Sequence, residues 1–243
     1  SYLVTPEMVE LISKIDANLI YLSLVKLPDS LKDKLRRKSL LKSSLYSARI
    51  EGNTLTLEQV EREEGQSDEK KEIFNILEAI EFIEASSLKT ITLKTISRLH
   101  AKVLAGLSAE GGFFRTEPSA IFNQASEAVY IAPAPDKISG LLEQMLKFSN
   151  SEQEKFPIIN AFVFHLIFEK IHPFIDGNGR VGRLLVFAIL KSKEKGLPFF
   201  IPFEEYLDEH KDEYYYHLDQ GLKNTNDYLM FMLGAFYEQT ERE

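Results

Sequence analysis

Two helical patterns in this sequence are joined by one segment, His172-Pro173-Phe174-Ile175-Asp176-Gly177-Asn178-Gly179-Arg180-Val181-Gly182-Arg183. Proline cannot continue a helix, so Pro173 ends the first pattern, and the glycines that follow allow a tight loop. The loop leads directly into the first turn of the next helix, where unpaired backbone N–H groups and the helix dipole favour a bound anion. The segment therefore predicts an anion site at the start of a helix.

Two arginines in the same segment support this site. Arg180 and Arg183 lie three residues apart, so they share one face near the positive end of the helix. Repulsion from the dipole costs roughly 0.3–1 kcal/mol per cation there, and a polyphosphate bound by both arginines would reverse that balance. The alternative is a pair of exposed arginines that bind nearby carboxylates.

Asp176 and His172 add the groups that phosphate chemistry needs. Asp176 immediately precedes the glycine loop, where its carboxylate could hold a magnesium ion that also contacts phosphate oxygens. The alternative for Asp176 is an ordinary helix N-cap. His172 lies four residues earlier and could accept a proton from a hydroxyl group near pH 7. A lone histidine before proline is usually a packing residue, but its place in this segment favours catalysis.

Three other kinds of site share part of this pattern. A dinucleotide-binding loop, G-x-G-x-x-G, must follow a buried strand, whereas Gly177 follows a helical pattern. A Walker A loop needs Gly-Lys-Ser/Thr, which the sequence lacks. A zinc or iron site would have to use ligands from a helix that Pro173 interrupts. The first of these ligands, His165, belongs to an apolar row of that helix, which favours a core histidine. The four side chains of that site would be His165, Glu169, His172 and Asp176.

The rest of the sequence predicts a mostly helical domain. Thr5-Pro6-Glu7 caps an opening amphipathic helix, and two short runs, at 120–122 and 128–131, predict a small β-hairpin. We expect residues 1–60 to form an N-terminal helical segment, with a short helix at about 40–51, and residues 61–243 to form the core. Helical patterns in the core cover residues 73–85, 92–104, 136–148, 152–170, 178–195, 203–220 and 227–239.

The composition excludes several classes of protein. The sequence has 29 Lys and Arg against 37 Asp and Glu, and this net charge of −8 disfavours nucleic acid backbones. It has no cysteine, so disulfide scaffolds, thiolate metal sites and cysteine nucleophiles are excluded. Its apolar runs are much shorter than the ~20 residues that span a bilayer. We expect a cytoplasmic protein with no membrane partner, and a basic cluster at 32–42 that forms a solvated face.

The segment at 172–183 resembles the signature of the Fic family, His-Pro-Phe-x-Asp/Glu-Gly-Asn-Gly-Arg-x-x-Arg, at every position. The resemblance covers roughly residues 40–236, with Leu99-His100 and Gly112-Phe113-Phe114-Arg115 upstream and Tyr214-Tyr215 downstream. It implies a helical domain of the Fic type that carries a β-hairpin flap. It also implies an enzyme that transfers AMP from ATP to a Tyr, Thr or Ser hydroxyl of a target protein and releases pyrophosphate. The Gly-Asn-Gly-Arg sequence argues against the related Doc kinases.

Position by position, the resemblance assigns roles that agree with the chemistry of the loop. His172 would be the general base and Asp176 the magnesium ligand, with ATP as substrate and Mg²⁺ as cofactor. The nucleotide would contact the rest of the segment and two residues farther along the chain. These contacts are Gly177, Asn178, Gly179, Arg180, Val181, Gly182, Arg183, His210 and Tyr215.

A second motif, Ser47-Ala48-Arg49-Ile50-Glu51-Gly52, resembles the inhibitory helix of Fic proteins. Its place before the core is typical of the subclass with an N-terminal inhibitory helix. Glu51 would pair with Arg183 and occupy the position of the γ-phosphate. A carboxylate and a phosphate cannot bind the same guanidinium positions together, so the resemblance implies low basal activity. The alternative is a solvated glutamate at a helix end.

Two other functions use the same residues. In the first, Glu51 aligns a water molecule that removes AMP from a modified target protein. In the second, the protein is a binding module without enzymatic activity, and a bound nucleotide changes its contact with another protein. The resemblance implies that a target protein docks on a flap at about 115–134. Modification of the chain's own Tyr or Ser side chains and formation of a homodimer are further hypotheses, and nucleic acid is not an expected partner.

Overall fold

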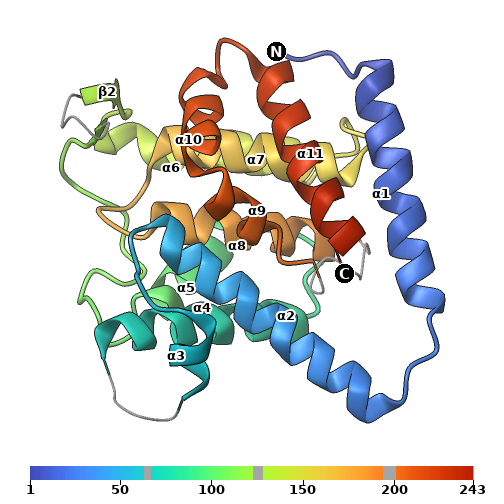
Figure 1. The fold of residues 1–243 in the computed structure, drawn as a ribbon. Helices are drawn as coiled ribbons and strands as arrows, with labels where there is room; N and C mark the ends of the chain where they lie inside the picture. Colours follow the sequence, from blue (N-terminus) through green and yellow to red (C-terminus); the bar gives the residue numbers. More distant parts are fainter. Residues whose placement is uncertain (63–66, 123–127, 194–200, 243) are drawn as a thin grey trace.

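The computed structural model describes residues 1–62, 67–122, 128–193 and 201–242, and this part of the chain contains eleven α-helices and one hairpin (Figure 1). The mostly helical fold that the sequence predicts is confirmed. A 3₁₀ turn, η1 (Pro135–Lys137), precedes the sixth helix. The helices are α1 (Pro6–Leu24), α2 (Asp29–Ile50), α3 (Leu57–Glu61), α4 (Asp68–Ala85), α5 (Leu93–Val103), α6 (Ile138–Ser149), α7 (Pro157–Ile171), α8 (Asn178–Ser192), α9 (Phe203–Glu209), α10 (Lys211–Gln220) and α11 (Thr225–Arg242).

α7 and α8 pack along each other in the middle of the molecule (Figure 1). α7 is buried on nearly every side and has no polar face, as expected for a core helix. Even so, none of the helices in the described ranges is both long and apolar enough to cross a membrane. α2 packs against α4 and α9, and α1 lies along α11. This arrangement brings the C-terminal end of α2 to the first turns of α8.

The helix expected at about 40–51 is longer than the sequence analysis predicts, because α2 already begins at Asp29. Lys and Arg are good helix formers, and neither glycine nor proline interrupts residues 29–50. The basic stretch therefore continues the helix and does not link two elements. Gly52 follows α2 with φ 106°, a conformation that ends the helix and that glycine adopts easily.

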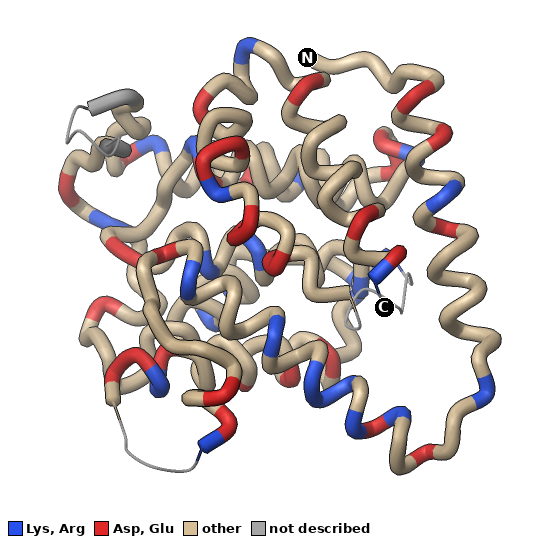
Figure 2. The backbone as a smooth tube through the Cα atoms, viewed as in Figure 1, with Lys and Arg blue, Asp and Glu red and all other residues tan. Residues whose placement is uncertain are grey.

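Basic residues are concentrated in the N-terminal part of α2 (Figure 2). Lys32, Lys34, Arg37 and Lys38 are exposed, in agreement with a solvated face. Two further members of the cluster form ion pairs with other helices. Arg36 pairs with Glu84 and Lys42 with Glu205, so both basic residues fix α2 to its neighbours.

Two other helices differ from the expected ranges. α7 begins at Pro157 and not at residue 152, because proline is accommodated in the first turn of a helix and not in its interior. The expected helix at 203–220 is divided at His210, whose φ of −117° and ψ of 41° are not helical. The predicted helix at 178–195 is described only as far as residue 193.

The hairpin lies where the sequence predicts it. β1 (Ala120–Phe122) and β2 (Ala128–Ile131) pair antiparallel, with Ala120 opposite Ile131 and Ile121 opposite Tyr130. The connecting residues, 123–127, lie outside the described part of the chain. The strands stand at the periphery of the molecule (Figure 1), and the two-stranded sheet has no third strand among the described residues.

Candidate active site

The loop between α7 and α8 has an unusual backbone. His172 ends α7 in a left-handed conformation, with φ 49° and ψ 60°, which is strained for a residue with a side chain. Gly177, with φ 80°, is the N-cap of α8. The Asn178 side chain fixes the turn, because it accepts a hydrogen bond from the Phe174 N–H and donates one to the Phe174 carbonyl, both at 2.9 Å. The tight loop that leads into a helix is therefore present, and the Asn178 side chain stabilises it.

The His172 imidazole is half-buried beside this loop. Its Nδ1 is buried and has no hydrogen-bond partner among the described residues. Burial lowers the pKa of His172 and the nearby charge of Arg115 acts in the same direction, whereas the Glu169 backbone, Glu51 and Asp176 oppose the shift. The ring is therefore neutral near pH 7, the state that can accept a proton.

Arg183 is fully buried and binds the C-terminal part of α2. Its Nη2 lies 2.8 Å from Glu51 Oε1 and 2.8 Å from the carbonyl oxygen of Ser47, and its Nε donates to Ser47 Oγ at 3.0 Å. Burial opposes the charge of this guanidinium, but Glu51 and Tyr214 hold the pKa of Arg183 above its ordinary value. The contact expected between Glu51 and Arg183 is thus present, and it joins α2 to the first turns of α8.

The Glu51 carboxylate also lies directly over the first turn of α8. A Cβ atom at Gly179 would be 2.1 Å from Glu51 Oε1 and 3.1 Å from Arg183 Nη1, so glycine leaves the room that the carboxylate fills. No side chain caps the N-terminus of α8 in the described structure. Glu51 therefore stands where the helix dipole and the buried arginine both favour an anion.

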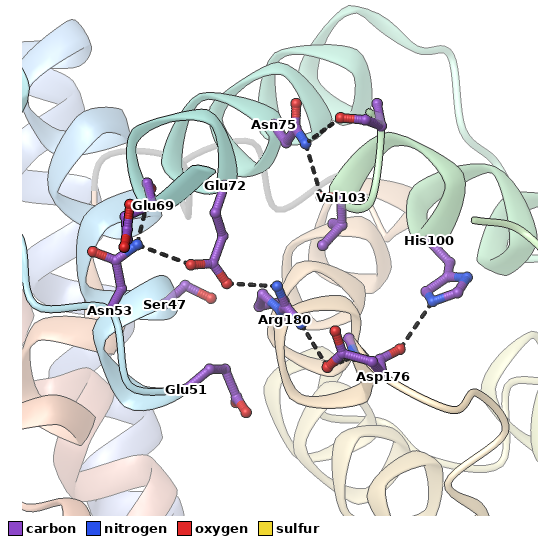
Figure 3. Close-up of polar contacts among 12 residues, drawn as sticks. Ser47, Glu51, Asn53, Glu69, Glu72, Asn75, His100, Val103, Asp176 and Arg180 are labelled. Atoms are coloured by element: carbon purple, nitrogen blue, oxygen red, sulfur yellow. Dashed lines mark hydrogen bonds and ion pairs between the residues drawn. The ribbon is translucent and has the colours of Figure 1, made fainter. Parts of the chain in front are cut away.

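Arg180 binds a different set of acids (Figure 3). Its Nη2 lies 2.7 Å from Asp176 Oδ1, and its Nη1 pairs with Glu72 of α4, which accepts a hydrogen bond from Asn53 Nδ2 at 2.8 Å. Both arginines are buried, so the hypothesis of exposed arginines is wrong, although each does bind carboxylates. Glu72 cannot be recognised from the sequence, because one glutamate in a charged helix gives no distinguishing signal.

Asp176 presents a carboxylate that is 68% exposed at the mouth of the loop. Its Oδ1 accepts from the Gly177 N–H at 2.6 Å and from Arg180, while Oδ2 has no partner among the described residues. The N-cap of α8 is Gly177, so the hypothesis that Asp176 is that cap is wrong. Magnesium usually binds one or two carboxylates together with substrate phosphates, and one exposed carboxylate with a free oxygen fits that pattern.

His100 of α5 also contacts the loop, although the sequence alone indicates no role for it. Its Nδ1 accepts from the Gly112 N–H at 2.8 Å, so Nε2 carries the proton and donates to the Asp176 carbonyl at 2.9 Å (Figure 3). Its ring stacks on Phe174 with the centroids 3.6 Å apart. Burial lowers the pKa of His100, which favours this neutral, doubly hydrogen-bonded state.

His165 and Glu169 belong to the core beneath α8. His165 Nε2 lies 2.8 Å from the Tyr214 hydroxyl, and burial lowers the pKa of His165 to about 3. Burial also raises the pKa of Glu169 to about 8, and a Cβ at Gly182 would lie 2.2 Å from Glu169 Oε1. Within the described ranges, no three His, Asp or Glu side chains are grouped to hold a metal ion. His165 is thus a core histidine, and Gly182 packs on this core.

The remaining expected nucleotide contacts lie in three different settings. Val181 is fully buried, and its N–H bonds to the Gly177 carbonyl at 3.0 Å. The ring of His210 stacks on Tyr206 between α9 and α10. The Tyr215 hydroxyl donates to the Ile50 carbonyl at 3.0 Å, so this side chain holds the end of α2.

Comparison with known proteins gives consistent relationships. The model of the Fic/DOC family matches residues 90–190. The chain is 32% identical over 234 residues to protein adenylyltransferase Fic of Drosophila mojavensis, covering 91% of this chain and 44% of that protein. It is 34% identical over 200 residues to the protein of the same name in Drosophila yakuba, covering 77% and 38%. The chain thus spans less than half the length of these curated relatives.

Solved structures extend the similarity to the whole described fold. A Fic family protein from Desulfovibrio desulfuricans superposes with a TM-score of 0.86 at 30% identity, covering 99% of this chain and 75% of that one. Fic-1 from C. elegans superposes with a TM-score of 0.75 at 23% identity, over 96% and 69% of the two chains, which supports the fold alone. Together with the signature at 172–183 and its loop geometry, these matches establish that the chain belongs to the Fic family.

Proposed function

We propose that this protein is a protein adenylyltransferase that moves AMP from ATP to a Tyr, Thr or Ser hydroxyl of a target protein. The observation that carries the proposal is the pairing of a neutral His172 with an anion-binding helix start that a carboxylate now fills. A phosphate group would find the same donors at that position. The names of the curated relatives agree with this activity.

The chemistry follows from the groups around the loop. His172 accepts the proton of the target hydroxyl as its oxygen forms a bond to the α-phosphorus of ATP. The bond from that phosphorus to the bridging oxygen of pyrophosphate breaks, and pyrophosphate leaves with the electron pair. The N–H groups of the first turn of α8 stabilise the added negative charge, and Arg183 binds the leaving phosphates.

Asp176 is the residue that would hold Mg²⁺ in this site. Its free Oδ2 and high exposure suit an ion that arrives with a nucleotide. When bound, Mg²⁺ would offset the charge of the phosphates. Arg180 already neutralises Oδ1 of the same carboxylate and keeps it oriented toward the loop.

Glu51 makes the described state an inhibited one in this proposal. Its carboxylate occupies the space over Gly179 and one donor of Arg183, so a terminal phosphate cannot bind there at the same time. Carboxylate and phosphate would also repel each other. Low basal transfer is therefore expected as long as α2 stays in place.

Replacing Glu51 tests both the activity and the inhibition. With α-labelled ATP and candidate target proteins, Glu51→Gly is expected to raise labelling about tenfold or more, because one lost charge pair is worth at least about 1.4 kcal/mol. The matched control is Glu152→Gly, since that glutamate is 87% exposed and lies outside the site. Flat labelling in a folded Glu51→Gly protein would contradict the inhibition. Label from γ-labelled ATP would contradict AMP transfer.

A second candidate function is the removal of AMP from a modified protein. Glu51 Oε1 binds Arg183, whereas Oε2 has no partner among the described residues and the side chain is 31% exposed. That free oxygen could hold a water molecule beside the loop. The test is to add the wild-type protein to a target that Glu51→Gly has labelled, with His172→Ala as the control. Release of AMP by the wild type supports this function, and stable label argues against it.

The target would dock on the flap, which we define as residues 115–134. A two-stranded hairpin with an open edge can pair its backbone with an extended segment of another protein. The Ile131 side chain, 78% exposed, would give that surface an apolar contact. Backbone pairing tolerates many sequences, so the modified residue is set by which hydroxyl reaches His172.

A further inference from the structure

Arg115 is a buried arginine whose partners among the described residues are all neutral. Its side chain is almost fully buried, and it forms no ion pair within the described ranges. Instead, four carbonyl oxygens accept its hydrogen bonds. Nε donates to His172 at 2.8 Å, Nη1 to Glu117 at 2.8 Å, and Nη2 to Pro133 at 2.6 Å and to Ile171 at 3.4 Å.

These carbonyls come from two different parts of the molecule. Ile171 and His172 form the end of α7, where the backbone turns into the loop. Glu117 and Pro133 belong to the two opposite arms of the flap, before β1 and after β2. The backbone N–H of Arg115 adds a bond to the Pro173 carbonyl at 2.9 Å. One side chain therefore joins both roots of the flap to the chain that carries His172.

A buried guanidinium with no counter-ion is costly, since its charge has left water without a carboxylate in exchange. Carbonyl dipoles can accept these four hydrogen bonds only if the backbone around the guanidinium keeps one arrangement. His172 needs such support, because its left-handed backbone persists only where its surroundings fix it. Its N–H bonds to the Phe168 carbonyl at 2.9 Å and its carbonyl to Arg115, so both backbone groups are held.

We infer that Arg115 is a positioning residue for His172, and that it couples the place where a target docks to the group that takes its proton. The inference rests on the proposed function. It adds that the flap segments at Glu117 and Pro133 keep a fixed position relative to His172, so a change at Arg115 affects the rate of transfer beyond the binding of nucleotide.

The charge of Arg115 gives this role a measurable signature. The charged groups that act on the His172 ring are Arg115, which lowers the pKa of His172, and Glu51 and Asp176, which raise it. Removing the positive charge should therefore raise the pKa of His172. The acid limb of the pH–rate profile would move to higher pH, on the order of half a unit for one nearby charge.

The experiment compares three variants in the Glu51→Gly protein. Arg115→Met removes the charge and the hydrogen bonds. Arg115→Lys keeps the charge but cannot bind four carbonyls in the planar arrangement of a guanidinium. Arg98→Met is the matched control, because Arg98 is exposed on α5 and stacks over Phe82. The readouts are kcat and KM for the target across pH, and an NMR titration of the His172 ring.

The expected results separate position from charge. Arg115→Lys should lower kcat about tenfold or more with the acid limb unchanged, because misplacing a catalytic group by about 1 Å can cost roughly 100-fold. Arg115→Met should lower kcat further and raise the pKa of His172 in both measurements. Arg98→Met should change neither quantity.

Several outcomes would overturn the inference. An unchanged kcat in Arg115→Lys would overturn it. If Arg115→Met does not fold, the kcat of Arg115→Lys alone is the test. An NMR titration of His172 that is the same with Arg and Met at position 115 would also overturn it, and it needs no activity. If the Glu51→Gly protein itself transfers no AMP, the proposed function fails instead, and the NMR titration still tests the effect of Arg115.

Discussion

The loop that carries His172 is held from two sides, and the two contacts differ in kind. On the α2 side, Arg183 binds Glu51 and Ser47 at the edge of the site, and the Glu51 carboxylate is 31% exposed. On the flap side, Arg115 is buried, and its hydrogen bonds within the described ranges all go to backbone carbonyls. The first contact joins opposite charges, and in the proposed function it exchanges its carboxylate for a phosphate. The second contact, of Arg115 with carbonyl oxygens, has no carboxylate among the described residues that a phosphate could replace, so we expect it to persist.

This difference matches the two tasks that the proposed function assigns to the site, release of Glu51 and support of His172. A contact that must release needs a competitor of the same charge, which the phosphates of a nucleotide provide at Arg183. A contact that must keep the geometry is better made with neutral groups that no substrate replaces. The contrast makes three predictions, which probe the flap side first and then the anchorage of α2.

The largest effect is expected at His172 itself. Both His172→Ala and His172→Gly should lower AMP transfer about 10²–10⁴-fold in the Glu51→Gly protein, because each removes the proton acceptor. The two variants should differ in stability, with His172→Gly more stable by about 1 kcal/mol, since glycine relieves the left-handed strain at φ 49°. Transfer rates and urea unfolding measure the two effects.

The matched pair isolates the backbone from the side chain. Equal stability of the Ala and Gly variants would show that the surroundings of His172, including Arg115, do not hold a strained conformation. Retained transfer in either variant would remove His172 from the proposed mechanism. A control at Gly177, where φ is already 80°, should show the reverse order, with Gly177→Ala less stable than the wild type.

Local patterns in the sequence predict much of this site. The loop at 172–183 and the hairpin strands follow from glycines, prolines and short apolar runs, which act over a few positions. Contacts between distant segments are harder to predict. Arg115 is quoted in the family resemblance, yet its role depends on carbonyls near residues 117, 133 and 172, which share no residue type. Glu72 and His100 lack a local signal for the same reason.

The boundaries that the sequence analysis misses have physical reasons of their own. A capping pattern at Ser151 and Glu154 suggests a helix start, but Glu154 accepts from the Phe156 N–H at 2.8 Å and the helix begins only at Pro157. Pro157 determines where α7 begins, because a proline ring would clash with the backbone in the interior of a helix. The helix predicted at about 40–51 begins earlier, at Asp29, and ion pairs with Glu84 and Glu205 offset part of the repulsion among its basic residues.

A smaller effect is expected of pH on the stability of the fold, through a buried contact between α9 and α2. Glu204 of α9 is buried and accepts from Ser43 Oγ of α2 at 2.6 Å, and burial raises the pKa of Glu204 to about 8. The folded protein therefore keeps a proton that the unfolded chain loses above about pH 4.5. Stability should fall as pH rises from about 5 to 8. Arg115 and its carbonyls contribute no such dependence.

Glu204→Gln tests this sign directly. A neutral amide keeps the side-chain size and cannot ionise, so the variant should lose less stability between pH 5.5 and 8.5, by on the order of a few kcal/mol. Glu169, with a pKa also raised to about 8, should leave part of the slope in place. Urea unfolding at several pH values measures it, with Glu152→Gln as the exposed control. A variant as pH-sensitive as the wild type would contradict a buried, protonated Glu204.

The smallest effect is expected at Ser47, which contributes one hydrogen bond to the releasable contact. Ser47→Ala removes the acceptor of Arg183 Nε but leaves Glu51 and the Ser47 carbonyl in place. One such bond is worth about 1 kcal/mol, so basal AMP transfer should rise about fivefold, well below the effect of Glu51→Gly. Ser44→Ala is the matched control, because Ser44 Oγ donates to the Leu40 carbonyl within α2. An equal rise in both variants would show that general loosening of α2, and not its contact with Arg183, sets the inhibition.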